Sequence, residues 1–308
     1  MTFELYSRRF TFRTQGPIHF AAGKPGNILR SALGNAFRKT TCSAECLGEC
    51  ANPETCQYAR LFEPSAIGKG PSGYSDRPRP FVFRIAHLDG KTFGANERFW
   101  FDVNLFIVQN PPIEQFTKAF EQLSREGVGP GRTRLQLLSV EPVGQDGSIA
   151  ELERAHHPIT LSLAAQSEGV RHVRVEFVTP TELKGAREPG FGVLFARIRD
   201  RVSALRTFYG RGPLSIDFRE ARERAAAVRI VGADLRHIRA SRRSSASGAT
   251  HDLGGYTGIA EYEGELGEFI PYLEAARWTG VGRHCVWGNG EMRLLPEASA
   301  HQRPALDR

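Results

Sequence analysis

The same order of secondary-structure elements can be read twice along this chain, and that repetition limits its fold more than any other feature. In the first half, alternating apolar and polar residues at 3–12 predict a strand, and an apolar stripe at 26–39 predicts a helix with Asn27 as its N-cap. Further patterns complete the half: strands at 79–87, 98–108 and 132–140, and a helix after Pro112. The order is strand-helix-strand-strand-helix-strand.

The second half repeats this order. Its predicted elements are a strand at 171–178, a helix at 191–209, strands at 226–239 and 254–264, a helix at 267–278 and a closing strand at 284–295. Helices that cover one face of an antiparallel sheet in this order form a ferredoxin-like fold of the RNA-recognition type. We therefore expect an α+β chain of two tandem ferredoxin-like domains, residues 1–145 and 158–308, with a Cys-rich insertion in the first and an Arg-rich helical insertion in the second.

Each half carries the tripeptide GVG between its second helix and its last strand, at 127–129 and 280–282. Glycine at such a place ends a helix in a left-handed conformation and lets the chain reverse. Gly288 and Gly290 then interrupt the closing strand, as glycines do at a bulge or at a close approach of another backbone. The stretch matches neither a Walker loop nor a dinucleotide-binding motif.

Arginine is concentrated in one segment. Residues 187–243 hold 14 arginines, no lysine and six acidic residues, a balance of +14 − 6 = +8 in a chain whose net charge is +7. The planar guanidinium binds phosphate through two hydrogen bonds and stacks on bases, which favours a nucleic-acid partner. A genome rich in G and C would also enrich arginine. The helix at 191–209 is predicted to clasp RNA, and the alternative is a solvated face paired with nearby carboxylates.

Four cysteines follow the first helix with the spacing C-x3-C-x3-C-x5-C. They are Cys42, Cys46, Cys50 and Cys56. Four thiolates can complete a tetrahedral structural zinc site, and reduced, partly buried thiols are the alternative, with an iron–sulfur cluster third. Cys285, in an apolar context, is predicted to pack in the core.

Membrane and export signals are missing from the sequence. It has no run of 18 apolar residues, and its first ten residues, MTFELYSRRF, lack the apolar core of a signal peptide. We expect a cytoplasmic protein that does not span a membrane.

Several motifs occur together in one order: GNILRSALGNAFR, TCQYARLFEP followed by DRPRPFVFR, GVGPGRTRLQLLSV, VRVEFVTPTELKG and the C-terminal stretch from 242 to 290. In this order the chain resembles the CRISPR-associated endoribonucleases of the RAMP superfamily, which cut precursor CRISPR RNA within its repeats. The resemblance covers nearly the whole chain. The chain departs from many relatives at two places: Gly280 stands where they carry a histidine, and its first helix holds no histidine. In this respect it resembles a divergent, histidine-poor branch of the family, such as that of type IV systems.

The resemblance implies metal-independent cleavage by the 2′-hydroxyl beside the scissile phosphate, which leaves a 2′,3′-cyclic phosphate. It implies as partners the repeat stem-loop, the mature CRISPR RNA and subunits of an effector complex. The alternatives are a non-catalytic RNA-binding subunit and a zinc-bearing protein-interaction module. A non-catalytic subunit would explain the missing histidine.

The resemblance places the site where the first helix faces the C-terminal glycine-rich stretch. The residues expected to be catalytic are Arg38, Arg242 and His284. Arginine stabilises a phosphorane but is a poor base, so His284 is the expected proton-transfer group unless it is an ordinary strand histidine. The segment 239–252 reads as a mobile loop that orders on RNA. The residues expected to bind RNA are Lys24, Arg30, Arg197, Arg201, Arg206, Arg236, Arg239, Arg243, Gly282, Arg283, Gly288 and Gly290.

Overall fold

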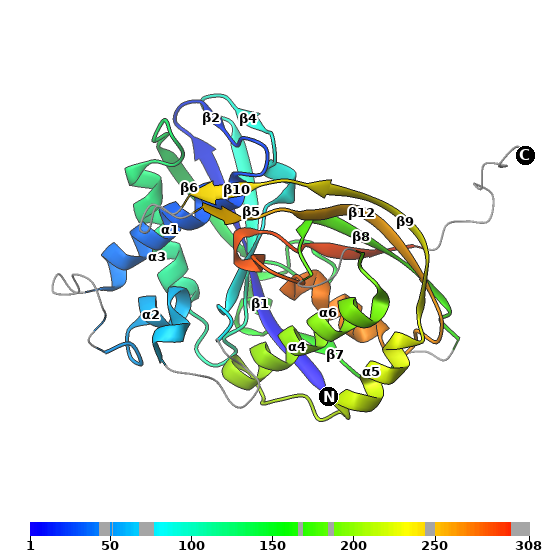
Figure 1. Cartoon of the computed structure of the whole chain (residues 1–308). Coiled ribbons are helices and arrows are strands. Elements are labelled where there is room, and N and C mark those ends of the chain that lie inside the picture. Colours follow the sequence, from blue (N-terminus) through cyan, green and yellow to red (C-terminus); the bar gives the residue numbers. More distant parts are fainter. Residues whose placement is uncertain are drawn as a thin grey trace, which may run out of the picture.

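The structure of the chain is a computed structural model that describes residues 1–42, 50, 52–67, 77–165, 169–183, 188–243 and 250–296. Its N-terminal half lies on the left of Figure 1 and its C-terminal half on the right. Among the described helices, none has both the length and the apolar character needed to cross a membrane.

The first half is an antiparallel sheet with two helices on one face. The strands lie in the order β3-β5-β1-β6, and β7 pairs with the first residues of β1. Apolar side chains alternate along β1 and β5 and face the helices, which gives the first hydrophobic core. The elements are β1 (Thr2–Thr14), α1 (Pro25–Thr41), β3 (Phe81–Arg84), β5 (Arg98–Leu105), α3 (Ile113–Glu126), β6 (Leu135–Pro142) and β7 (Ile159–Ser162).

Shorter elements surround this half. They are the strand pair β2 (Ile18–His19) and β4 (Thr92–Phe93), the helix α2 (Gln57–Phe62), and the 3₁₀ turns η1 (Pro64–Ile67), η2 (Ala86–Leu88) and η3 (Leu152–His156).

The second half repeats the arrangement, with strands in the order β13-β8-β12-β9 and helices α4 and α6 packed together on one face. The expected pair of ferredoxin-like folds is therefore confirmed. The elements are β8 (His172–Thr181), α4 (Phe191–Tyr209), α5 (Phe218–Ala226), β9 (Arg229–Ile238), β10 (Ser241–Arg243), β11 (Thr250–Asp252), β12 (Gly255–Glu263), α6 (Ile270–Thr279), η4 (Cys285–Trp287) and β13 (Met292–Leu295).

Strand β1 ties the two halves together, and Figure 1 shows it running between them. Phe10 and Phe12 belong to the core of the first half, whereas Phe3 and Leu5, at the start of the same strand, belong to the core of the second. Because one strand contributes to both cores, the halves pack as one body and hold the surfaces between them in place.

Two local expectations were wrong, and a third is tested only at its ends. Asn27 is not the N-cap: Lys24 holds that position and Pro25 follows at the first helical position, where its missing N–H costs nothing. The closing strand begins only at Met292, because residues 285–287 form a 3₁₀ turn. In the segment 239–252, expected to be a mobile loop, β10 and β11 pair at the two ends, and residues 244–249 lie outside the described residues.

Candidate functional site

The first turn of α1 packs against the glycine-rich loop of the second half. Gly26 lies so close to η4 that a Cβ on it would sit 1.6 Å from the carbonyl oxygen of Trp287. One turn further along α1, the guanidinium of Arg30 lies 4.0 Å from the centre of the Trp287 ring. A bare backbone at Gly26 and a cation–π contact at Arg30 therefore hold the helix to the loop.

A cavity of about 950 Å³ opens beside this contact, and we call it the junction cavity. Both halves line it: the N-terminal end of α1 and η2 come from the first, and the ends of β8 and β9, β10 and the loop after η4 come from the second. Lys24, Arg239 and Arg293 bring positive charge to its wall, and Asp89 and Glu291 bring negative charge. The cations outnumber the carboxylates by one, and Arg293 is also paired with Glu176 at 2.6 Å, so the positive excess comes from Lys24 and Arg239. A cavity shared by two halves is a common place for a ligand.

Lys24 also fixes the β10–β11 hairpin. Its Nζ donates to the carbonyl oxygen of Ser241, the first residue of β10, at 2.8 Å. Arg242 pairs in register with His251 across this hairpin. Its backbone lies next to the junction cavity, because the preceding residue, Ser241, lines that cavity. The side chains of Arg242 and Arg243 lie outside the described residues, and their roles remain predictions.

His87 lines the junction cavity, and sequence reasoning missed it. Its ring stacks on Trp100 with centroids 4.1 Å apart, and its Nε2 lies 2.8 Å from the Trp100 carbonyl oxygen. A carbonyl only accepts, so Nε2 carries the proton and Nδ1 holds the lone pair of the neutral ring. The signal in the sequence is weak, since His87 is one histidine among nine.

His284 occupies a different position. It is the residue before η4, in a left-handed conformation with φ of 63°, and its side chain is 19% exposed. Its Nε2 lies 3.9 Å from Oε2 of Glu182. The other carboxylate oxygen of Glu182, Oε1, accepts a hydrogen bond from Arg283 at 3.0 Å. Sequence reasoning found no carboxylate for His284, because Glu182 is distant in the sequence. His284 is not among the residues that line the junction cavity.

The glycines of the loop make room for protein atoms. A Cβ on Gly282 would lie 2.3 Å from the carbonyl oxygen of Glu182, and one on Gly290 would lie 2.0 Å from that of Val281. The amides of Gly288 and Gly290 donate to the carbonyls of Cys285 and Pro180. Close packing therefore explains why glycine stands at 282 and 290, while Gly288 also lines the junction cavity. The RNA contacts expected of Gly282, Gly288 and Gly290 stay predictions.

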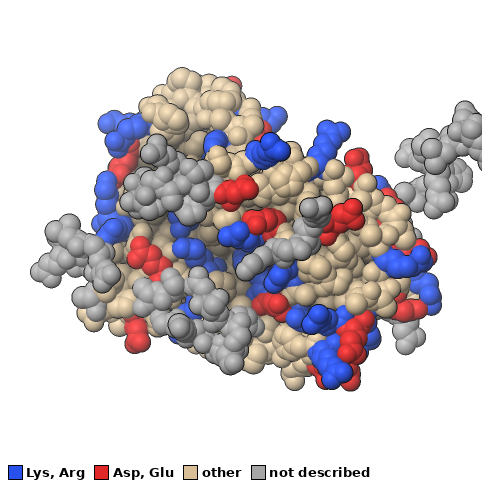
Figure 2. Space-filling view, viewed as in Figure 1, with Lys and Arg blue, Asp and Glu red and all other residues tan. Residues whose placement is uncertain are grey.

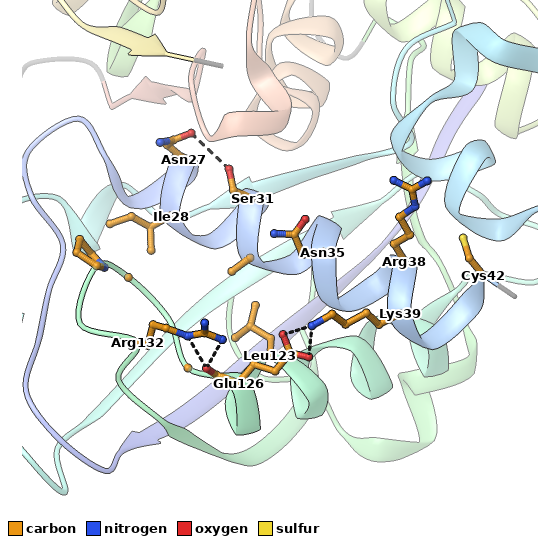
Figure 3. A pocket seen from close by; sticks show the side chains of 14 residues that line it. Asn27, Ile28, Ser31, Asn35, Arg38, Lys39, Cys42, Leu123, Glu126 and Arg132 are labelled. Atoms are coloured by element: carbon orange, nitrogen blue, oxygen red, sulfur yellow. Dashed lines mark hydrogen bonds and ion pairs between the residues drawn. The ribbon is translucent and has the colours of Figure 1, made fainter. Parts of the chain in front are cut away.

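Arg38 lies near the other end of α1, twelve residues beyond Gly26, which corresponds to about 18 Å along the helix axis. There it lines a groove of about 870 Å³ between α1, the end of α3 and the loop 127–132, shown in Figure 3 and called the α1 groove from here on. Its guanidinium lies 5.7 Å from the ring of Tyr58. The structure does not bring Arg38 and His284 to one point.

The arginines of α4 have structural partners. Arg206 is 8% exposed and donates to the carbonyls of Thr2 and Gly212, and burial lowers its pKa. Arg201 donates from Nε to the carbonyl of Thr279, at the end of α6, at 2.9 Å. The structure disfavours the expected contact of Arg206 with RNA, because its guanidinium is largely buried and is bound to backbone carbonyl oxygens.

Charged side chains are found both where the two halves meet and over helix α5. Figure 2 shows Lys and Arg side chains where the halves meet, with Asp and Glu side chains among them, and alternating blue and red over α5. The α5 pattern reflects ion pairs, among them Arg219 with Glu223 at 3.0 Å and Arg224 with Glu268 at 2.6 Å. Arg197, Arg236 and Arg239 are exposed, and of these only Arg239 lines the junction cavity.

The cysteine cluster is partly described. Burial works to raise the pKa of the Cys56 thiol, but the N–H of Ala59 and hydrogen bonds from the Cys50 and Cys42 thiols lower it overall. Cys46 lies outside the described residues. Within the described part of the chain, no group of three or more Cys, His, Asp or Glu side chains is arranged to hold a metal ion. Cys285 is buried, as expected, although in a 3₁₀ turn and not a strand.

The tandem ferredoxin-like architecture, with α1 held against a glycine-rich loop, defines a protein of the RNA-recognition type. Residues 3–163 match the profile of the AF_1859 N-terminal domain family, and residues 175–292 match that of the CRISPR-associated endoribonuclease Cas6. The chain thus belongs to the AF_1859 N-terminal domain family and is a CRISPR-associated, RNA-processing protein of the RAMP type. None of the curated proteins matches it.

Solved structures of Cas6 proteins share this fold at low sequence identity. A Cas6 product complex aligns with a TM-score of 0.56 and 15% identity, over 94% of this chain and 100% of that one. Thermus thermophilus Cas6 aligns with a TM-score of 0.52 and 15% identity, over 95% and 98%. A partial Cas6-RT-Cas1–Cas2 complex aligns with 0.54 and 14%, over 95% of this chain and 46% of that one.

Proposed function

We propose that this protein binds the repeat stem-loop of precursor CRISPR RNA at the junction cavity and cleaves it there. The observation that carries the proposal is the contact between Gly26 and Trp287, which fixes α1 and the glycine-rich loop beside a cavity rimmed by Lys24, Arg239 and Arg293. The similar Cas6 structures include a product complex, which supports RNA as the ligand.

The proposed reaction needs no bound cofactor. The 2′-hydroxyl beside the scissile phosphate loses its proton to a base and attacks the phosphorus in line. The bond from phosphorus to the 5′-oxygen breaks, that oxygen takes up a proton, and the products are a 2′,3′-cyclic phosphate and a free 5′-hydroxyl. The protein must supply a base, an acid and positive charge for the pentacoordinate phosphorane.

His87 is the base that the geometry favours over His284. Its ring is held by Trp100 on one face, and the bond from Nε2 to a carbonyl leaves the lone pair on Nδ1. It lines the junction cavity, whereas His284 does not. Lys24 and Arg239, on the same cavity wall, are the proposed donors to the phosphorane oxygens.

Incubation of the purified protein with repeat RNA in EDTA tests the proposal directly. We expect cleavage at one position, abolished by a 2′-deoxy substitution at the nucleotide before the cut. Binding without cleavage would instead support a non-catalytic subunit that carries CRISPR RNA. Co-purification of mature CRISPR RNA and effector subunits would extend the proposal to a stable ribonucleoprotein.

We also propose a structural zinc ion at the cysteine cluster, outside the chemistry. The support is the shared hydrogen bonding of Cys42, Cys50 and Cys56 and the lowered thiol pKa of Cys56, since zinc binds thiolates. Metal analysis of protein purified without chelators should find one equivalent of zinc, and its removal should destabilise the first half. Protein that carries neither zinc nor iron would show that the thiols are simply reduced.

A further inference from the structure

The α1 groove carries polar side chains that the proposed cleavage reaction does not use. Asn27, Ser31, Asn35 and Arg38 follow one another at intervals of three or four residues, so they share one face of α1. Figure 3 shows all four on the same side of the helix. The helix contains no aspartate or glutamate, so no carboxylate of α1 opposes an anion along this face.

The opposite wall of the groove is preformed. The chain turns at Gly127, where a Cβ would lie 2.1 Å from the carbonyl oxygen of Arg132, and Val128 bridges to Thr133. Arg132 itself has a positive φ of 46°, which is uncommon for a residue with a side chain. Its Nε and Nη2 point at the carbonyl of Glu126, the last residue of α3, at 3.3 Å.

The chemistry of the groove matches a polyanion that carries flat rings. Three of its lining residues are cationic (Arg38, Lys39 and Arg132), and one is anionic (Glu126, which is paired with Lys39 at 2.8 Å). Between the walls, Ile28, Ala32 and Leu123 form an apolar floor. Single-stranded RNA needs cations for its phosphates, apolar surface for its bases and amides or hydroxyls for the base edges.

We propose that the α1 groove binds single-stranded RNA that continues from the strand held at the junction cavity. The two sites are contiguous, because Lys24, Pro25 and Gly26 line the junction cavity and Asn27, the next residue, lines the groove. The path along α1 is about 25 Å long. This inference rests on the proposed function in one respect: RNA bound at the junction cavity is what brings the single strand to the start of the groove.

The test compares a hairpin RNA with the same hairpin extended by a single strand at its 5′ or its 3′ end. In the wild type, one of the extensions should tighten binding. Asn35→Glu places a carboxylate on the exposed face of α1, where glutamate suits a helix better than asparagine, so the fold should persist. The variant should bind that extended RNA about tenfold more weakly than the wild type does, and it should bind the bare hairpin with unchanged affinity.

Gln115→Glu is the matched control. It adds the same charge in the first turn of α3, at the other end of that helix from Glu126, and should change neither affinity. The proposal is overturned if no extension tightens wild-type binding, or if Asn35→Glu weakens both RNAs equally or neither. An acidic peptide in the groove would give that last result. Absence of cleavage in EDTA would overturn the proposed function alone, because the affinity gained from an extension is measured without cleavage.

Discussion

Two helices of this protein carry arginines, and the fold uses those arginines differently. Helix α4 holds Arg197, Arg199, Arg201 and Arg206, and two of these, Arg199 and Arg206, are each 8% exposed, with backbone oxygens among their partners. Helix α1 holds only Arg30 and Arg38. Arg30 lies over the Trp287 ring, and Arg38 lies over the Tyr58 ring and lines the α1 groove. Local density of arginine therefore does not by itself show which arginines are available to bind phosphate, because buried carbonyl groups compete for guanidinium as phosphate does.

The largest expected effect lies at the junction cavity. His87→Gln keeps a donor for the Trp100 carbonyl but removes the base, so single-turnover cleavage with saturating protein should slow by about 100- to 10,000-fold. RNA affinity should change little. His284→Ala is the comparison variant and should cut at nearly the normal rate. The reverse result, with His284→Ala slow and His87→Gln normal, would move the base to the glycine-rich loop.

Arg206→Ala tests the structural role of the arginines of α4. It leaves the carbonyls of Thr2 and Gly212 without their charged donor, so the free energy of unfolding should fall by about 2–4 kcal/mol. Denaturant unfolding measures this, with Arg222→Ala on the exposed face of α5 as the control that should change stability by less than about 0.5 kcal/mol. Equal, small effects of the two variants would mean that Arg206 is not structural.

Gly26→Ala tests how α1 is held against η4. The added methyl group meets the backbone of Trp287, which cannot move aside as a side chain can, so we expect a loss of about 1–3 kcal/mol in stability. Gly34→Ala, two turns along the same helix, places its Cβ 3.6 Å from the Phe62 ring and should be neutral or stabilising. Thermal unfolding of the pair gives the contrast. A harmless Gly26→Ala would argue against a close contact.

The smallest expected effect is that of Lys24→Gln, which keeps a donor near Ser241 but removes a charge from the junction cavity. RNA affinity should fall by about tenfold or less, and the slope of log affinity against log salt should decrease by about one. Arg222→Gln removes the same charge from α5 and should leave that slope unchanged. If both variants lowered the slope equally, the RNA would be contacting the arginine-rich side of the molecule as well.

The sequence by itself determined the class of fold, and it did so through local patterns. Alternation of apolar residues along β1 and the apolar stripes of α1, α3 and α4 each depend on neighbours within one element, so they can be read without knowing what lies opposite. The resemblance of ordered motifs to CRISPR-associated RAMP proteins added the family, and the profile matches and structural comparisons confirm it.

Tertiary structure alone decided which groups meet. His87, in η2 just after β3, reaches Trp100 on the neighbouring strand β5, and Arg206 reaches Thr2, which lies 204 positions away in the sequence. Gly26 meets Trp287 although 260 residues separate them. No local pattern records such pairs, because a helix face or a glycine looks the same in sequence whether water, backbone or RNA covers it. Burial and hydrogen-bond partners distinguish these cases, and both arise only when the whole chain is folded.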